Sequence, residues 1–363
     1  MAERPTMKDV ARAAGVSLMT VSRVVAGEAG VAPQTAARVE EAIRTLGYQR
    51  NDIARNLRRK AQDSRTIGLV VDDLANPFFS ALARSVEDEA YRRGFLVLVG
   101  STNDDPRRER DVVSAFCARQ VDGLVLVPTG GNRAFFRAQM ARGVKVVCVD
   151  RPAAGLPVDC VAVDNRAGAG TAVRHLLVHG HRRIAYLGDR QEIWTQRERF
   201  AGYEEALAAA GLAVDTALVR HGLRGHQEAA AAIGELMASS APPTALFSGN
   251  DLVTLGAVEA GASRRFALVG FDDFLLADKL NPPVSVVSQD PAALGRTAAQ
   301  LLFGRIDGDD AAPRSVVLET RFVDRGSGGK VGEMAEAAKV VEVAGTGKVA
   351  EVAELAGTGE AGE

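Results

Sequence analysis

The sequence contains little of what would place it in a membrane or in an oxidising compartment. None of its 363 residues belongs to an apolar run near the roughly 18 residues of a membrane-spanning helix. The first residues lack an apolar signal core, so we expect a cytoplasmic protein. The cysteines are odd in number, have apolar neighbours and match no zinc-ligand spacing. We therefore expect three buried thiols rather than disulfides, namely Cys117, Cys148 and Cys160.

Common catalytic motifs are also missing from the sequence. There is no phosphate-binding P-loop, no GxSxG turn, and no GxGxxG between a strand and a helix. The glycine-rich stretch 166–173 lacks dinucleotide spacing. His175 and His179 stand four residues apart, as zinc ligands on a helix do, but no HExxH pattern or nearby acid completes a site. We therefore expect neither an enzyme nor a metal or cofactor.

Charge is distributed unevenly along the chain. The whole chain carries a net charge of −2, but residues 1–65 carry +5 and residues 327–363 carry −4. A basic N-terminal segment on an acidic body indicates a polyanionic partner for that segment alone. Residues 327–363 have few large apolar side chains and nearly repeat the sequence VAGTG, so we expect a low-complexity, disordered tail.

The basic segment predicts three short helices with helix-turn-helix spacing. We expect helices over 7–14 and 18–25, and a third from Pro33 to the residue before Gly47. Thr6 and Ser17 cap the first two helices in this interpretation. Apolar residues would bury the second helix against the first, and glycine would allow the turn between them; these are Val10, Ala11, Gly15, Val21 and Val24.

The start of the second helix would then face outward with an unusual composition. Leu18 and Met19 could contact thymine methyl groups in a major groove, and Arg23 could read a guanine. Thr20, Ser22 and the helix N-termini could hold phosphates. The alternative is a small three-helix bundle with a solvated basic face.

After Thr66, short apolar runs alternate with helical stretches of ten to twenty residues. Wholly apolar strands that alternate with helices are typical of parallel sheets covered on both faces. About eight such units fit two doubly wound lobes better than one sheet. Many of the strands end in Asp or Asn, and ligands of open α/β sheets bind at those carboxyl ends.

The stretch from Thr6 to Arg65 resembles the LacI/GalR family of bacterial transcription regulators. The resemblance rests on MKDVARAAGVSLMTVSRVV (7–25) and on Val31, Ala37, Val39, Ala42, Leu46, Gly47, Tyr48, Asn51, Ala54 and Leu57. It extends through the rest of the chain to about Arg325. It implies an all-α helix-turn-helix head with a hinge helix, followed by an α/β core of two doubly wound lobes like that of periplasmic sugar-binding proteins.

On the basis of this resemblance we expect the chain to have four parts. The head covers residues 1–50, and the hinge helix and linker cover residues 51–65. The effector-binding and dimerisation core covers residues 66–326, and the tail covers residues 327–363. Within the core, lobe 1 would comprise 66–161 and 291–326, and lobe 2 would comprise 162–290.

The resemblance also implies residues that contact DNA. Leu18, Met19 and Arg23 match the base-reading positions, and Leu57 matches a leucine that wedges into the minor groove at the operator centre. The full expected set is Thr6, Ser17, Leu18, Met19, Thr20, Ser22, Arg23, Asn51, Ala54, Arg55, Leu57 and Arg58. Arg50 stands where the family often has proline, so we expect a less sharply defined hinge helix.

Effector-contacting residues follow in the same way. The expected set is Phe78, Asp150, Trp194, Arg199, Asn250 and Asp272. Carboxylates, an amide and a guanidinium suit a hydroxyl-rich ligand, because each hydroxyl both donates and accepts. Two questions stay open. Trp194, which we expect in a loop, either stacks on a sugar or only covers the cleft. The aspartates at the strand ends could instead cap the following helices. A short connector before residue 266 departs from the family pattern.

The function implied is an allosteric DNA-binding regulator. A homodimer would bind double-stranded operator DNA in the nucleoid, without membrane contact, under the control of a small effector. Repression is expected, with a sugar or sugar derivative as the effector. The alternatives are an activator, a corepressor-dependent regulator that responds to a purine or nucleoside, and, remotely, a sugar-binding protein without a DNA function.

Overall fold

The computed structural model describes residues 5–26, 28, 30–48, 64–131 and 133–329. The chain divides into two compact units, Met1–Ser64 and Arg65–Glu363. The expectations for Arg50, the hinge helix and almost all of the tail lie outside the described residues. The DNA-contacting candidates affected are Asn51, Ala54, Arg55, Leu57 and Arg58.

The N-terminal unit contains the three predicted helices. They are α1 (Met7–Ala14), α2 (Leu18–Ala26) and α3 (Pro33–Leu46). Gly15 and Gly47 end α1 and α3 with φ angles of 63° and 61°, a conformation that favours glycine. Val10, Val21 and Val39 are fully buried, one from each helix, and form the centre of a small apolar core. The helix-turn-helix interpretation of the sequence is therefore confirmed at the level of the fold.

Polar caps fix the ends of the first two helices. The backbone N–H and the hydroxyl of Thr6 both donate to Oδ2 of Asp9, at 2.9 and 2.6 Å. Ser17 Oγ accepts a hydrogen bond of 3.1 Å from the backbone N–H of Thr20. An N-cap of this kind stabilises a helix by about 1 kcal/mol, so Ser17 sets where α2 begins.

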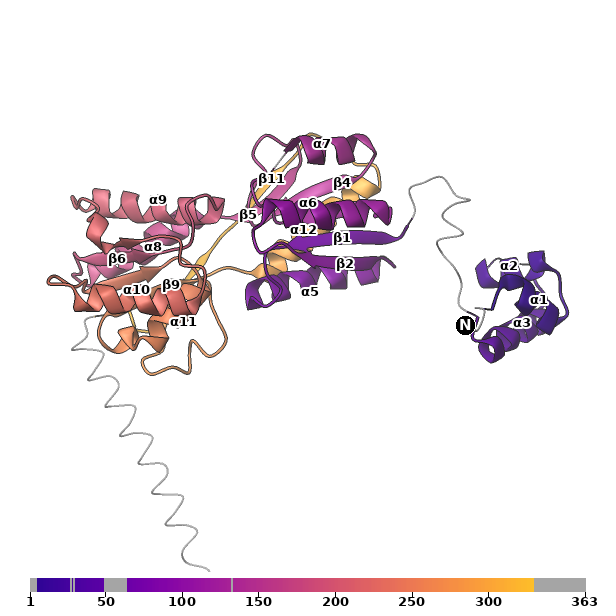
Figure 1. Ribbon diagram of the computed structural model, residues 1–363, viewed down its shortest axis with the longest axis horizontal. Helices are drawn as coiled ribbons and strands as arrows, with labels where there is room; N and C mark the ends of the chain where they lie inside the picture. Colours follow the sequence, from indigo (N-terminus) through magenta and orange to yellow (C-terminus); the bar gives the residue numbers. More distant parts are fainter. Residues whose placement is uncertain (1–4, 27, 29, 49–63, 132, 330–363) are drawn as a thin grey trace, which may run out of the picture. The chain divides into compact units, whose positions relative to one another are not determined.

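The larger unit is built on two six-stranded sheets (Figure 1). The first sheet has the order β11-β5-β4-β3-β1-β2, and all of its neighbouring strands are parallel. Its strands are β1 (Thr66–Val71), β2 (Leu96–Ser101), β3 (Gly123–Leu126), β4 (Lys145–Val149), β5 (Asp159–Val163) and β11 (Ser315–Leu318).

The second sheet has the order β12-β10-β9-β8-β6-β7, and only the β10–β12 pair is antiparallel. Its strands are β6 (Ile184–Leu187), β7 (Val219–Arg220), β8 (Ala245–Ser248), β9 (Ala267–Phe271), β10 (Ser285–Ser288) and β12 (Arg321–Val323). Each sheet with its helices forms one lobe of the unit.

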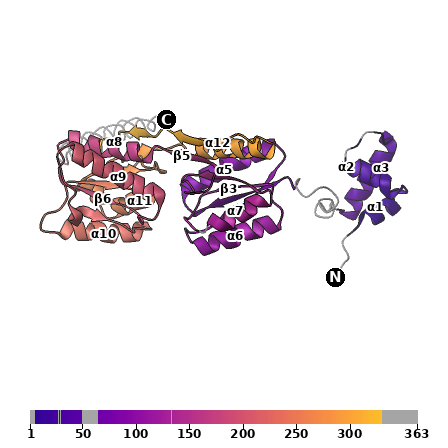
Figure 2. The same cartoon turned by 90° about the horizontal axis from the view of Figure 1, so that it is seen from above.

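Helices cover both faces of each sheet (Figures 1 and 2). In lobe 1, α5 (Pro77–Arg92) and α12 (Pro291–Ile306) pack on one face, and α6 (Pro106–Ala118) and α7 (Arg133–Ala141) on the other. In lobe 2, α8 (Asn165–Val178) and α9 (Trp194–Ala209) pack on one face, and α10 (His226–Ala238) and α11 (Asp251–Glu259) on the other. Two 3₁₀ turns, Thr216–Leu218 and Ala262–Arg264, complete lobe 2. The predicted pair of doubly wound lobes is confirmed.

The end of the chain differs from the predicted lobe limits. Residues 321–326 were expected in lobe 1, but β12 pairs with β10 in lobe 2. β5 extends lobe 1 to Val163, beyond the predicted limit at residue 161. Ser327 was expected to begin a disordered tail, yet it is fully buried: its Oγ accepts from the N–H of Ser285 and donates to the carbonyl of Leu268. Within the described residues the chain therefore crosses between the lobes three times, after β5, β10 and β11.

The cysteines are free thiols. Cys148 and Cys160 are buried, as expected, whereas Cys117 is only half-buried. Burial raises the pKa of Cys160 to about 12 and also raises the pKa of Cys148 and Cys117. None of the described helices is long and apolar enough to cross a membrane.

Candidate functional site

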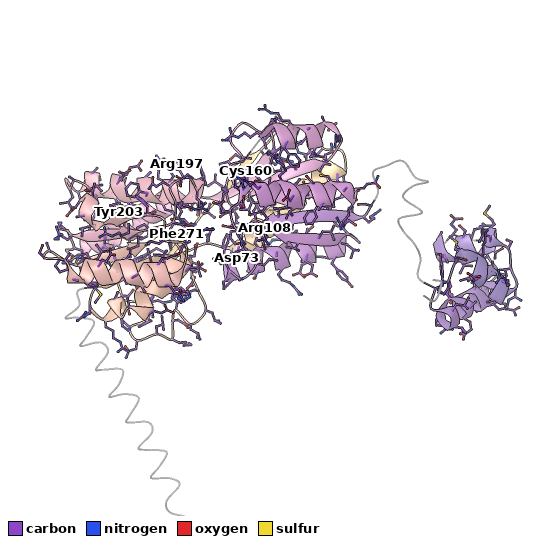
Figure 3. The ribbon with its side chains drawn as sticks, viewed as in Figure 1. Asp73, Arg108, Cys160, Arg197, Tyr203 and Phe271 are labelled. Carbon is purple, nitrogen blue, oxygen red and sulfur yellow. The ribbon has the colours of Figure 1, made fainter. Side chains whose placement is uncertain are left out.

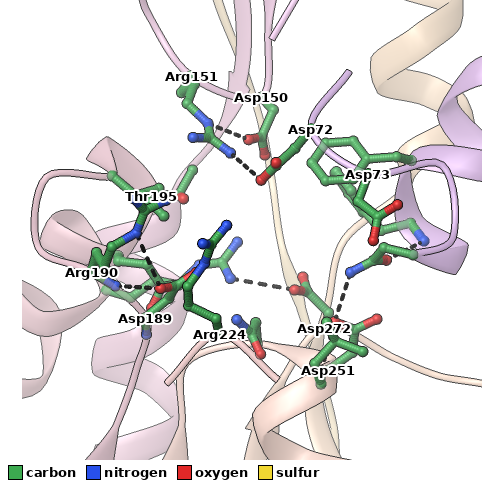
Figure 4. A pocket seen from close by; sticks show the side chains of 18 of the residues that line it. Asp72, Asp73, Asp150, Arg151, Asp189, Arg190, Thr195, Arg224, Asp251 and Asp272 are labelled. Atoms are coloured by element: carbon green, nitrogen blue, oxygen red, sulfur yellow. Dashed lines mark hydrogen bonds and ion pairs between the residues drawn. The ribbon is translucent and has the colours of Figure 1, made fainter. Parts of the chain in front are cut away.

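The two lobes line a common cavity of about 340 Å³ (Figure 4). It lies beyond the carboxyl ends of β1, β4, β6, β8 and β9, where the loops after the strands and the starts of α5, α9 and α11 meet. Figure 3 shows Asp73 of lobe 1 and Phe271 of lobe 2 on the sides that face each other. Parallel strands direct polar residues to this edge because their carboxyl ends point the same way.

Five of the six predicted effector-contacting residues line this cavity, and one does not. Lobe 1 contributes Phe78 and Asp150, and lobe 2 contributes Arg199, Asn250 and Asp272. Trp194 is not in a loop, as was expected, but is the first residue of α9, and it borders two neighbouring hollows instead of the cavity. Thr195 and Gln196, which follow it, take the places on the cavity wall.

Arg199 is held rigidly in the wall of lobe 2. Only 3% of its surface is exposed. Its Nε donates to Asn165 Oδ1 at 2.7 Å, and its Nη1 donates to the carbonyl of Gly249 at 2.6 Å and to Asp272 Oδ2 at 3.3 Å. The Cζ atom also stands 3.7 Å from the centroid of the Phe271 ring. Protein acceptors therefore already hold this guanidinium.

Asp150 and Asp272 occupy equivalent places at the strand ends of the two lobes. Both have positive φ, at 70° and 72°, which is uncommon for residues other than glycine. Asp272 accepts a hydrogen bond from Gln289 Nε2 in addition to the contact with Arg199. Burial raises the pKa of Asp272, and the positive charge of Arg199 opposes that rise.

Arg151 is a cavity residue that the sequence did not single out. It is 6% exposed and contacts three carboxylates: Asp104 Oδ1 at 3.0 Å, Asp150 Oδ2 at 3.1 Å and Asp72 Oδ2 at 3.6 Å. Burial alone would lower the pKa of Arg151, but the three carboxylates raise it above the ordinary value. Burial raises the pKa of Asp72 and of Asp104, and Arg151 limits both shifts.

Three polar contacts join the lobes across this cavity. Asp104 Oδ2 of lobe 1 lies 2.5 Å from Arg190 Nη2 of lobe 2. Arg224 Nη2 donates to the carbonyl of Asn103 at 3.1 Å. Asn76 Nδ2 donates to Asp251 Oδ1 at 3.2 Å. Sequence reasoning missed these contacts, because all of their residues except Asp251 lie in loops whose only local signal is a strand that ends nearby.

The strand-end residues of lobe 2 divide between capping and the cavity. Asn250 caps α11 by accepting from the N–H of Val253 at 2.8 Å, and it also lines the cavity. Burial raises the pKa of Asp251 to about 6, with repulsion from Asp272 as the next cause. Asp273 accepts from the N–H of Phe274 and pairs with Arg325, so its contacts are structural. Because turns and not a helix follow Asp273, the alternative helix-capping role is not observed for this residue.

The outer face of α2 has the composition that was expected of it. Leu18 is 46% exposed and Met19 is 71% exposed, and Ser22 is also exposed. Arg23 is half-buried, with its Nε 3.7 Å from Glu28 Oε2. Thr6 and Ser17 are exposed and Thr20 is half-buried. Leu18 and Met19 therefore expose neighbouring apolar surface on the described part of this unit.

Both units of the chain match known protein families. Residues 6–51 match the model of bacterial regulatory proteins of the lacI family, and residues 173–328 match the periplasmic binding protein-like domain. The chain is 31% identical over 331 residues to the HTH-type transcriptional repressor CytR of Escherichia coli strain K12, covering 89% of this chain and 96% of that one. It belongs to the LacI family. Members of this family are DNA-binding transcription regulators and not enzymes.

Further LacI-family relatives extend the comparison. The HTH-type transcriptional regulator CelR of Thermobifida fusca is 35% identical over 340 residues, covering 90% of this chain and 98% of that one. A solved CelR–cellobiose complex is 33% identical with a TM-score of 0.65, covering 89% and 100% of the two chains. The Lac repressor dimer bound to operator and the anti-inducer ONPF is 25% identical with a TM-score of 0.77, covering 90% and 100%.

Proposed function

We propose that this LacI-family protein is a repressor whose affinity for operator DNA is set by a small effector bound between the lobes. The observation that carries the proposal is the cavity that both lobes line together, in a chain that also contains a helix-turn-helix unit. A ligand in that cavity contacts both lobes at once. It therefore shifts the equilibrium between lobe arrangements by the difference in its affinity for them.

The head supplies the DNA contacts in this proposal. Leu18 and Met19 enter the major groove, where thymine methyl groups cover their exposed apolar surface, and Arg23 reads a guanine after leaving Glu28. Thr6, Ser17, Thr20 and Ser22 contact phosphates. The segment 51–58, which lies outside the described residues, is proposed to contact the operator, with Leu57 as the minor-groove wedge.

The functional form is a homodimer in the cytoplasm, bound to the nucleoid. Large apolar side chains are exposed on each lobe: Tyr91 at the end of α5, Leu96 and Val99 on the edge strand β2, and Leu275 and Leu276 after β9. Exposed apolar surface of this kind favours association between copies. A dimer is also the state of the similar Lac repressor structure bound to operator.

The effector that the cavity supports best is a saccharide. Its wall offers carboxylates, amides and guanidinium groups to hydroxyls, and Phe78 offers an aromatic face. CelR, which is similar over nearly the whole chain, was solved with cellobiose. A nucleoside is the second candidate, because its base could stack on Phe78.

The test is selection of random duplex DNA by the purified full chain at fixed salt, followed by sequencing of the bound pool. A near-palindromic motif with a deformable central step is expected. The motif should be lost in the Leu57→Ala variant. It should be kept in the Leu212→Ala variant, because Leu212 lies in the larger unit and not in the head. Failure to recover a motif, both alone and with a metabolite mixture, would overturn the proposal. Placing the selected motif upstream of a reporter gene distinguishes repression from activation.

A further inference from the structure

Each guanidinium group in the cavity between the lobes already donates to the protein, although the buried Nε of Arg190 has no hydrogen-bond partner among the described residues. Arg151 serves three aspartates, and Arg199 serves Asn165, Gly249 and Asp272. Arg190 binds Asp104, and Arg224 binds the carbonyl of Asn103. A ligand acceptor that approaches Arg151 or Arg199 would therefore have to compete with bonds inside the protein.

One acceptor atom in the cavity wall is unpaired within the described part of the chain. Gln289 is 9% exposed and lines the cavity, and its Nε2 is committed to Asp272. Its Oε1 atom is buried and has no hydrogen-bond partner among the described residues. Leaving a buried acceptor without a donor costs about 1–3 kcal/mol of stability. A ligand that donates a hydrogen bond to this atom would remove that cost.

Negatively charged groups outnumber positively charged groups in the cavity. Its lining contains seven carboxylates but only four guanidinium groups. Asp72, Asp73, Asp150 and Arg151 approach from lobe 1, and Asp189, Arg190, Arg224, Asp251 and Asp272 from lobe 2 (Figure 4). Burial raises the pKa of Asp72, Asp189, Asp251 and Asp272, and the nearby guanidinium groups only partly offset these rises.

We infer that the effector of this cleft carries no anionic group, and that it is an unphosphorylated, hydroxyl-rich saccharide rather than a sugar phosphate, a nucleotide or a carboxylate. Each hydroxyl donates to a carboxylate or to Gln289 Oε1 and adds no charge. A phosphate brings up to two negative charges into a partly desolvated space that already holds excess carboxylates, where Coulomb repulsion is weakly screened. The inference rests on the proposed function, because it takes the cavity to be the effector site.

The test uses paired ligands that differ by one phosphate. The full chain is titrated with cellobiose and cellobiose 6′-phosphate, glucose and glucose 6-phosphate, ribose and ribose 5-phosphate, and cytidine and cytidine 5′-monophosphate. Thermal denaturation and the fluorescence of Trp194, the single tryptophan, report binding. Every member that binds is expected to be unphosphorylated. Its phosphorylated partner should bind at least tenfold more weakly at low salt, and the difference should shrink as salt increases.

Charge-neutral variants show whether the cavity carboxylates are responsible. Asp72→Asn and Asp189→Asn should reduce the preference for the unphosphorylated partner several-fold. Glu235→Gln removes the same charge from α10 at an exposed position outside the cavity, and it should leave the preference unchanged.

A phosphorylated member that binds more tightly than its partner would overturn the inference. So would a panel without any binder, or equal effects of Asp189→Asn and Glu235→Gln. Selection of operator DNA by the same preparation tests the regulator proposal independently of these ligand-binding results. A motif recovered from DNA together with tight binding of a sugar phosphate would refute the effector class and leave the regulator proposal standing.

Discussion

Asn76 at the start of α5 and Asp251 at the start of α11 are joined by a hydrogen bond of 3.2 Å that links the two lobes. The acceptor is Oδ1, which also accepts from the N–H of Leu252 at 2.8 Å. Both of these hydrogen bonds are accepted by the same oxygen of Asp251, whose carboxyl group is also repelled by Asp272.

This geometry predicts that Asp251 makes the fold more stable in acid. The folded pKa, about 6, lies above the unfolded value, so the folded chain binds the extra proton between about pH 4 and pH 6. Stability should fall as the pH rises through that window and stay low above it. Asp251→Asn keeps the accepting oxygen and removes the charge. It should raise the free energy of unfolding by about 1–3 kcal/mol at pH 7.5 and leave it nearly unchanged at pH 4.

Urea unfolding across that pH range measures the effect. Asp73→Asn is the matched control, because Asp73 is an exposed aspartate of the same cavity. If the two variants showed the same pH profile, the assignment of the window to Asp251 would be wrong.

Arg151 should be a principal contributor to the stability of lobe 1. Arg151→Met leaves three buried or half-buried carboxylates without their cation, and we expect a loss of about 3–5 kcal/mol. Arg166→Met provides the comparison. Arg166 also contacts two carboxylates, at 3.0 Å each, but its side chain is 49% exposed, so the loss should stay below about 1 kcal/mol. Denaturant midpoints of both variants decide the matter, and equal losses would contradict the expectation.

Arg23 should determine one base of the operator. Arg23→Ala is expected to weaken binding by about 1–3 kcal/mol and to relax preference at one position in each half-site. Arg44→Ala is the control, since Arg44 lies on α3 and, like Arg23, forms an ion pair with a glutamate, Glu41. Repeating the DNA selection with each variant measures both effects. An unchanged motif for Arg23→Ala would exclude it as a base-reading residue.

The edge strand β2 should be part of the dimer interface. Leu96 is 72% exposed, and Leu96→Glu would place a charge in an apolar contact, so we expect monomers at concentrations where the parent chain is dimeric. Val178→Glu makes the same change at the last residue of α8, which is 83% exposed, and should leave the dimer intact. Sedimentation velocity distinguishes the two outcomes. A dimeric Leu96→Glu protein would remove β2 from the interface.

Local signals were enough to predict the helices of the head. Gly15 and Gly47 adopt left-handed conformations at the residues where helices were expected to end, and Ser17 caps the next helix. The two lobes could be predicted because wholly apolar strands alternate with helices. Ligands of open α/β sheets bind at the carboxyl ends of the strands, and this predicted that Asp150 and Asp272 lie at the cavity. The sequence could not predict the distance between these two residues.

Features that depend on distant partners could not be predicted. β12 is three residues long and partly exposed, and its pairing with β10 has no local pattern that would place it in lobe 2. Trp194 missed the cavity because α9 turns Thr195, Gln196 and Arg199 towards it, and the rotation of a helix is set by its packing. Arg151 escaped notice because its three carboxylates come from separate loops.

Burial of two native thiols makes this chain suited to optical measurement of lobe movement. Cys148 and Cys160 are buried and their pKa is raised, so both stay protonated and react slowly with maleimides at neutral pH. After replacement of the half-buried Cys117, a cysteine introduced at an exposed position on each lobe would therefore take up a fluorophore selectively. Because three crossings restrain the lobes, a single distance between two dyes would follow their opening and closing, and the protein could serve as a biosensor for its own effector.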